Sequence, residues 1–183
     1  MIRKRILYLL LTVFICIASV FFLYSKKAAV FPTQTTCAFC NEQILRRQKF
    51  YEDELVMALY THKPIVPSHF LIIPKRHVKR LEMLSEEEVV RVYQVIQKVN
   101  RASHKVFQTT SYFIHQKNGK EVGQSVPHVH FHYISKQPKD SSSFIFLVKM
   151  IIAYLSPPLS SEKMQQATKK MQAAMESEMT LLQ

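Results

Sequence analysis

Three histidines alternate with apolar residues in the stretch GQSVPHVHFHYI, which covers residues 123–134. In a β-strand, side chains at i, i+2 and i+4 project from one face, so His128, His130 and His132 would lie side by side. The intervening Val, Phe and Tyr favour strands and would face a core. We therefore predict a strand over 126–135. A row of three imidazoles is hard to justify by stability alone, and it indicates a chemical site.

The positive charge of the chain does not by itself identify a nucleic-acid-binding protein. The formal net charge is +12, but five positive residues flank an apolar N-terminal segment and every acidic residue follows it. The remaining excess suits an anionic ligand or a membrane surface as well as a polynucleotide. Neither an RNA-binding strand nor a recognition helix is evident in the sequence. We therefore expect no nucleic-acid partner.

The apolar N-terminal segment is a run of 19 uncharged residues, 6–24, which follows a basic N-terminus at 1–5. As a helix it would cover most of a bilayer core, and no clear cleavage site follows it. We therefore predict a single-pass membrane protein with an uncleaved anchor, in the inner membrane if the source is bacterial. A signal peptide and a buried helix are the alternatives. The basic residues on either side of the segment favour an exported domain. In an oxidising compartment, however, Cys37 and Cys40 would tend to form a disulfide, so the membrane topology stays open.

The remainder of the chain predicts an α+β domain with an antiparallel sheet, preceded by a linker at 25–36. Ser85 and Glu88 form a capping box at the start of the longest expected helix. Strands are expected at 49–51, 55–60, 69–74 and 111–116 before the histidine strand, and helices at 42–48 and 85–107, with turns at 51–54 and 117–119.

Residues 139–183 are expected to form a C-terminal helical extension. The apolar run 144–155 is too short to span a membrane and predicts a buried helix or an interface element. Ser160 or Ser161 can cap a last helix, with an apolar stripe that suits a core or a dimer contact. The members of this stripe are Met164, Met171, Met175 and Leu182.

The histidine stretch with its Gly-Gln-Ser lead-in resembles the signature of the histidine triad (HIT) superfamily. The resemblance extends upstream through Cys37-x-x-Cys40, Tyr51-Glu52-Asp53, the run from Pro67 to His77 and Leu84-Ser85-Glu86-Glu87-Glu88. It covers about residues 37–138. It implies a HIT-like fold, with a sheet of about five strands, one long helix and one short helix. A homodimer is also expected by resemblance.

The resemblance implies a nucleotide hydrolase or nucleotidyl transferase that acts at the α-phosphate of a nucleotide conjugate, such as a phosphoramidate or a dinucleoside polyphosphate. His130 would be the nucleophile and form a nucleotidyl-histidine intermediate. His132 would bind the phosphate and, with Ser125, help to protonate the leaving group, while His128 supports the central ring. The residues expected to bind substrate are His69, Thr61, Lys117, Asn118, Gly123 and Gln124. His62, His104 and His115 match no motif and are expected to be ordinary surface or half-buried residues.

Four further residues suggest a metal site. Cys37, Cys40, His77 and His128 would together offer two thiolates and two imidazoles, a set that suits tetrahedral Zn²⁺. Bacterial-type HIT proteins resemble this chain in placing zinc on these four positions, and the role would be structural rather than catalytic. The alternative is an empty or disulfide-bonded cysteine pair.

The sequence differs from the family pattern at three positions, and two other functions remain as alternatives. Thr61 replaces an Asp or Asn that holds ribose hydroxyls, Lys117 replaces a Gln of diadenosine-polyphosphate hydrolases, and Pro127 cannot donate to a strand ladder. One alternative function is a non-catalytic, membrane-tethered module for nucleotide binding or zinc-dependent interaction. Another is a metallohydrolase that uses the three histidines as ligands.

Overall fold

The computed structural model describes residues 37–109, 111–136 and 142–180, together with Tyr8, Leu11, Thr12, Ile15 and Ser19 near the N-terminus. The expected linker at 25–36 and Leu182 lie outside the described residues. The fold described below belongs to the compact unit Pro32–Gln183.

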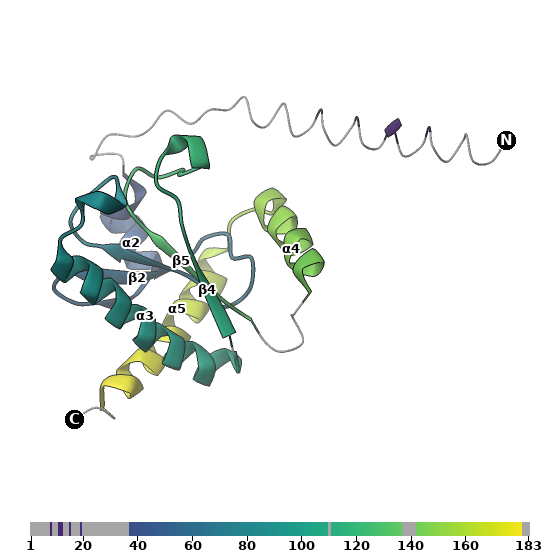
Figure 1. Ribbon diagram of the computed structural model, residues 1–183. Coiled ribbons are helices and arrows are strands. Elements are labelled where there is room, and N and C mark those ends of the chain that lie inside the picture. The colour runs from purple at the N-terminus through teal and green to yellow at the C-terminus, as the bar shows by residue number, and fades with distance from the viewer. Residues whose placement is uncertain are drawn as a thin grey trace. The chain divides into compact units, whose positions relative to one another are not determined.

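Five antiparallel strands form a single sheet, as the α+β prediction requires (Figure 1). Their order across the sheet is β1-β2-β3-β5-β4, so β1 and β4 are the edges. The side chain of Asp53 shapes the first hairpin, because its Oδ1 accepts hydrogen bonds from the N–H groups of Leu55 and Val56. The strands are β1 (Lys49–Glu52), β2 (Val56–Tyr60), β3 (His69–Pro74), β4 (Ser111–Gln116) and β5 (Phe131–Lys136).

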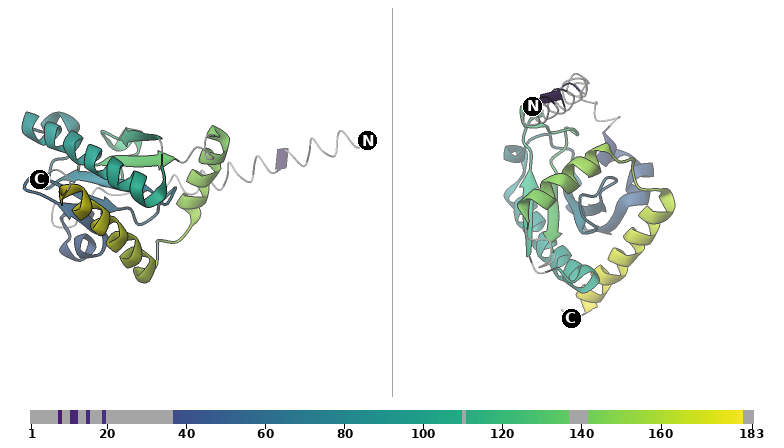
Figure 2. Two further views of the ribbon diagram at one scale, coloured as in Figure 1. Left: turned by 90° about the horizontal axis from the view of Figure 1, so that it is seen from below. Right: turned by 90° about the vertical axis from the view of Figure 1, so that its right-hand side faces the viewer.

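Two long helices, α3 (Glu86–Phe107) and α5 (Ser161–Thr180), pack side by side against one face of this sheet (Figure 2). Alternation along the strands explains which side chains meet them. Phe70 and Ile72 of β3 and Tyr133 of β5 are fully buried on this face. The helices contribute a stripe of apolar residues to the same core, as amphipathic helices do. These residues are Val92, Val95, Ile96, Val99, Ala102, Met164, Met171 and Met175.

The opposite face of the sheet is covered by the N-terminal part of the described chain. The 3₁₀ turn η2 (Ala38–Cys40) and helix α2 (Glu42–Gln48) begin this part. Phe39 packs there with Met57, Leu59, Leu71 and Ile73 in a second, smaller apolar cluster. His69 of β3, His115 of β4 and His132 of β5 lie on the rest of this face. One face of the sheet therefore packs against the long helices, and the other carries the histidines.

The start of α3 is fixed by the capping box that the sequence predicts. The Ser85 side chain accepts a hydrogen bond from the Glu88 N–H, and the Glu88 carboxylate accepts from the Ser85 N–H. Arg76, just after β3, donates two further hydrogen bonds to the same carboxylate at 2.9 and 2.6 Å. These bonds anchor the segment after β3, which carries His77 and the 3₁₀ turn η3 (Leu81–Met83).

The histidine strand begins later than predicted. Strand β5 starts at Phe131, so the prediction of a strand from residue 126 is wrong for its first five residues. Pro127 has no N–H, the His128 N–H turns back to the Val126 carbonyl, and the Val129 N–H donates to the Val78 carbonyl. The chain therefore bends here instead of pairing with β3, and only His132 of the three histidines lies within the strand.

Helix α4 (Ser143–Leu155) forms where an apolar helix was expected, but none of its described residues is buried. Of the two predicted roles, a buried helix is therefore wrong, and an interface element stays a prediction. The Phe146 ring meets Phe113 of β4 at 5.4 Å, and the Tyr154 carbonyl accepts a hydrogen bond from Lys63. α4 is thus attached to the domain at both ends while most of its apolar surface faces outward.

The prediction of a single-pass membrane protein is contradicted. Among the described residues, no helix combines the length and the apolar character needed to cross a bilayer. The long helices α3 and α5 carry charges along their length, and α4, with 13 residues, extends only about 20 Å against a bilayer core of about 30 Å. Most of the predicted anchor, 6–24, lies outside the described residues.

Helix α5 is expected to contribute to the stability of the sheet rather than to form a loose appendage. Met171 is fully buried, and Glu178 of α5 forms ion pairs with Arg101 and Lys105 of α3. Met171→Ala should lower the free energy of unfolding by about 2–4 kcal/mol, because it leaves a cavity in the core. Met83→Ala in η3, where Met83 is exposed, is the matched control and should cost less than about 0.5 kcal/mol. Urea unfolding measures both, and equal losses would contradict the packing of α5.

Candidate active site and metal centre

The three histidines of the triad divide between two sites. The imidazoles of His130 and His132 lie together, with ring centroids 5.0 Å apart. The ring of His128 turns toward Cys37 and Cys40 instead. The prediction that all three line one face of a strand is therefore wrong, since the bend before β5 rotates His128 away from its neighbours.

The protonation of His130 follows from one hydrogen bond. Its Nδ1 lies 2.7 Å from the backbone carbonyl of His128, and a carbonyl oxygen can only accept. The hydrogen of the neutral ring is therefore on Nδ1, and Nε2 carries the lone pair. The structure thus gives this buried imidazole the tautomer that a nucleophile at Nε2 requires.

A second chain of hydrogen bonds orients His132. The Ile65 N–H donates to His69 Nδ1 at 3.2 Å, so the hydrogen of the neutral His69 ring is on Nε2. His69 Nε2 lies 2.8 Å from His132 Nδ1 and donates to it. The remaining hydrogen of His132 is then on Nε2. Beside the lone pair of His130, the site therefore presents an N–H donor.

Burial and neighbouring positive groups keep these imidazoles neutral. Burial lowers the pKa of His69 to about 4, with His115 adding to the effect. For His132, burial and then His130, His69, His115 and Lys117 lower the pKa to about 2. Burial also lowers the pKa of His130, although the His128 carbonyl opposes it. The lowered pKa of His130 therefore keeps its ring neutral at neutral pH.

An apolar wall borders the histidines on one side. Phe39, between the two cysteines, places its ring 5.1 Å from the ring of His130 in an edge-to-face contact. Leu59 and Leu71 are buried beside it, and Thr61 follows β2 with 6% of its surface exposed. These side chains are almost completely buried, so they hold the His130 ring in position rather than offer a surface to a ligand. Phe39 was not predicted from the sequence, although its position between two candidate metal ligands could have identified it.

The loop before the histidines contains the remaining predicted binding residues. Gly123 has φ +81°, a left-handed conformation that favours glycine, and ends the 3₁₀ turn η4 (Lys120–Val122). A Cβ at Gly123 would lie 3.3 Å from the Lys117 ammonium, so this cation reaches over the loop. Ser125, two residues after Gly123, is exposed.

Two predicted binding side chains have structural partners in this loop. Asn118 accepts from the Leu81 N–H at 2.8 Å and donates to Glu82 at 2.7 Å. Gln124 accepts from the Gly119 N–H at 2.8 Å and donates to the Lys79 carbonyl at 3.0 Å. These bonds fix the loop against the segment after β3, and they engage both amides away from the imidazoles.

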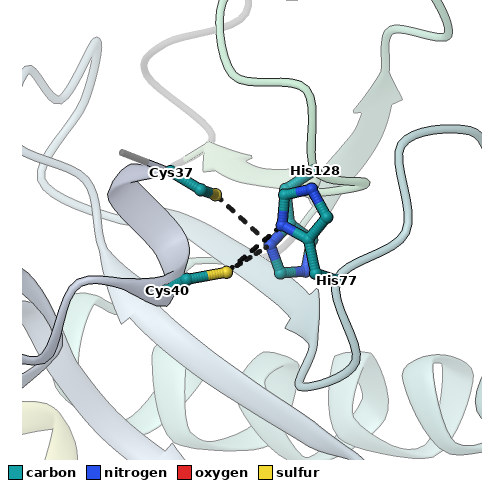
Figure 3. A group of neighbouring side chains, drawn as sticks. All are labelled: Cys37, Cys40, His77 and His128. Atoms are coloured by element: carbon teal, nitrogen blue, oxygen red, sulfur yellow. Dashed lines mark hydrogen bonds between the residues drawn. The ribbon is translucent and has the colours of Figure 1, made fainter. Parts of the chain in front are cut away.

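Cys37, Cys40, His77 and His128 converge on one point from segments far apart in the sequence (Figure 3). Their ligand atoms all lie within 4.8 Å of one another, and the two thiols are not joined in a disulfide. Sulfur-to-nitrogen distances are 3.6 Å for Cys37–His128, 3.2 Å for Cys40–His77 and 3.7 Å for Cys40–His128. Tetrahedral zinc, with its usual bonds to sulfur and nitrogen, would place such atoms about 3.5 Å apart.

The ring nitrogens of His128 and His77 that face away from the cysteines differ in their partners. His128 Nε2 lies 2.9 Å from the Pro74 carbonyl and donates its hydrogen there, which leaves the Nδ1 lone pair facing the sulfurs. Among the described groups, the buried Nε2 of His77 has no hydrogen-bond partner. The donor set and its spacing fit a four-coordinate metal ion, so all four residues predicted as ligands come together.

His115 lies beside the site, contrary to the prediction that it is an ordinary surface residue. It pairs with His132 across β4 and β5, and the two ring centroids are 5.8 Å apart. His104 instead lies on α3 and bonds the Thr109 carbonyl through Nδ1. The pairing of β4 with β5 places His115, but not His104, beside His132. This pairing could have been predicted from the turn between the two strands.

Comparisons with known proteins agree with this geometry. The chain is 39% identical over 95 residues to the bis(5'-nucleosyl)-tetraphosphatase [asymmetrical] of Schizosaccharomyces pombe, covering 52% of each chain. It is 33% identical to the bis(5'-adenosyl)-triphosphatase of Dictyostelium discoideum, covering 58% of this chain and 71% of that protein. The chain therefore spans only about half the length of the first of these relatives.

A solved structure and a family model cover more of the chain. The Hit-like protein involved in cell-cycle regulation from Bartonella henselae superposes with a TM-score of 0.61 and 25% identity, covering 80% of this chain and 99% of that one. The HIT domain model matches residues 43–139. These residues contain the whole sheet, the long helix and the three histidines, and on this evidence the chain belongs to the HIT domain family.

Proposed function

We propose that this chain is a nucleotide hydrolase or nucleotidyl transferase that cleaves a nucleotide conjugate at its α-phosphate. The observation that carries the proposal is the hydrogen bond from His130 Nδ1 to the His128 carbonyl, which leaves the lone pair on His130 Nε2. The ring of His132, with its N–H donor, lies beside it. A neutral imidazole with an adjacent proton donor is suited to nucleophilic attack at phosphorus. The names of the two relatives, a tetraphosphatase and a triphosphatase, support the same chemistry.

In the first step, His130 Nε2 forms a bond to the α-phosphorus while the bond from phosphorus to the leaving group breaks. The positive charge that develops on the His130 ring is stabilised by the His128 carbonyl, which accepts from Nδ1–H. His132 donates a hydrogen bond from Nε2–H to the departing atom or to a phosphoryl oxygen, and His69 holds its ring in position. Ser125 supplies a second donor. The leaving group departs with the electron pair of the broken bond.

In the second step, water or another acceptor attacks the phosphorus and releases His130. Hydrolysis adds the hydroxyl of water to phosphorus, returns the nucleoside monophosphate and neutral His130, and releases one proton to solvent. We assign the ribose to the side of Thr61, which follows β2, as the resemblance to the family implies. The shorter side chain of Thr61 would bind ribose hydroxyls less strongly than a carboxylate does.

His130→Ala should abolish both turnover and the covalent adduct without unfolding the protein. The expected loss in kcat is about a thousandfold or more, because the bond-forming atom is removed. Hydrolysis of a fluorogenic adenylate conjugate and mass spectrometry of the trapped intermediate measure the two effects. His104→Ala, which removes an imidazole from α3, is the control. Undiminished hydrolysis by His130→Ala would refute the assignment, and nucleotide binding without turnover by the unaltered chain would favour a binding module.

We infer that Cys37, Cys40, His77 and His128 hold a zinc ion in a structural role. Two sulfur and two nitrogen donors at this spacing match the preferences of zinc, and they fill all four positions of a tetrahedron. A bound ion would supply no open position for substrate. The four residues would instead hold Phe39 and the His128 carbonyl, both of which contact the ring of His130.

Zinc analysis of the purified full chain should therefore find one ion per chain. Removing it with a chelator should lower the free energy of unfolding by about 3–4 kcal/mol if free zinc otherwise exceeds its dissociation constant several hundredfold. His77→Ala should lower zinc content, whereas His104→Ala should retain it. Elemental analysis and chemical unfolding give the two readouts, and full zinc content in His77→Ala would remove that residue from the site.

We also infer a homodimer through β4 and α4. Strand β4 is an edge strand, and Tyr112, Phe113 and Ile114 on it are 41%, 38% and 38% exposed. The neighbouring α4 presents Phe144, Ile151 and further apolar side chains outward. A second copy would satisfy the unpaired backbone of the edge and cover this apolar surface.

Ile151→Glu should shift the protein toward the monomer, because it places a charge in the proposed interface. Light scattering coupled to size exclusion measures the mass over a range of concentrations. Ile151→Leu, which keeps the apolar character, should behave as the unaltered chain does. A dimer unaffected by the glutamate would place the interface elsewhere.

A further inference from the structure

His115 occupies a position at the edge of the site that the mechanism above does not use. It projects from β4 on the same face as His132, because directly paired residues of antiparallel strands share a face. Its ring lies 5.8 Å from the ring of His132, and its side chain is exposed. It is therefore accessible to a ligand bound at His132.

The order of the strands shows which part of a substrate would reach His115. Across this face, Thr61 follows β2, His69 lies on β3, His132 on β5 and His115 on β4. The nucleoside is assigned to the β2 end of this face, beside Thr61. We place the part of the substrate beyond the α-phosphate toward β4, because His115 is the exposed neighbour of His132 on that strand.

The charges around this edge favour an anion. The Lys117 ammonium lies over Gly123, next to the exposed Ser125. Lys117 is the cation that acts on both His130 and His132, because the surrounding imidazoles are neutral at physiological pH. A ligand that carries negative charge beyond the α-phosphate would supply the counter-charge, whereas a neutral leaving group would not.

We propose that His115, together with Lys117, forms a leaving-group subsite that binds the further phosphates of a polyphosphate conjugate and selects such substrates over conjugates with a neutral leaving group. The position rests on the proposed function, since it is defined by attack from His130. His115 donates a ring N–H to a phosphate oxygen and Lys117 contributes its charge. His115 is a specificity-determining residue and takes no part in bond formation.

Binding can be measured without turnover in the His130→Ala background. Calorimetry with AMP and ATP, in the absence of divalent cations, compares ligands that share the nucleoside and the α-phosphate. ATP should bind at least about tenfold more tightly than AMP, the size expected for charge-assisted hydrogen bonds. Adding His115→Ala should remove most of this preference. Adding His115→Gln, which retains an N–H donor, should keep much of it, and adding His104→Ala should keep all of it. An ATP preference that is the same with and without His115 overturns the proposal.

Turnover separates this proposal from the proposed function. With His130 intact, the ratio of kcat/KM for diadenosine tetraphosphate to that for adenosine 5'-phosphoramidate should fall about tenfold or more in His115→Ala. If the unaltered chain cleaves both substrates but the ratio does not depend on His115, the subsite is refuted and the hydrolase stands. If neither substrate is cleaved while the ATP preference depends on His115, the hydrolase is refuted and the anion subsite stands.

Discussion

The hydrogen bonds of His128 connect the cluster of two cysteines and two histidines to the candidate active site. Its ring donates to the Pro74 carbonyl and faces two thiols, and its backbone carbonyl accepts from His130. One residue therefore fixes both the direction of a donor toward this cluster and the tautomer of His130. Displacing its ring would move the carbonyl on which His130 depends, so the two sites are coupled through a single peptide unit.

The bend before β5 makes this arrangement possible. A regular strand would have directed His128, His130 and His132 to one face, where one of them could not have reached the cysteines. Pro127 prevents that regularity, and the bond from Val129 to Val78 holds the bend in place. The departure from ideal strand geometry is thus where the chain gains a second function for one of its histidines.

Much of the fold could be predicted because it follows from local signals. Ser85 and Glu88 marked the start of α3, and the apolar run of β3 marked a buried strand. The bend at 126–130 was only partly predictable, since Pro127 indicated a break in the ladder but the bond from Val129 joins a residue far away in the sequence. The place of His115 beside His132 follows from cross-strand pairing rather than from its own neighbours, and the turn between the two predicted strands could have indicated it.

The bond from the Ile65 amide to His69 has a wider consequence. The Ile65 N–H fixes the tautomer of His69, and His69 in turn fixes the tautomer of His132. The group that sets both tautomers is therefore in the main chain and not in a side chain. Substitution at position 65 can therefore change size, charge or polarity without reversing the pair. Proline is the exception, since it alone removes the N–H. The orientation of the His132 ring is therefore independent of which side chain, other than proline, stands at position 65.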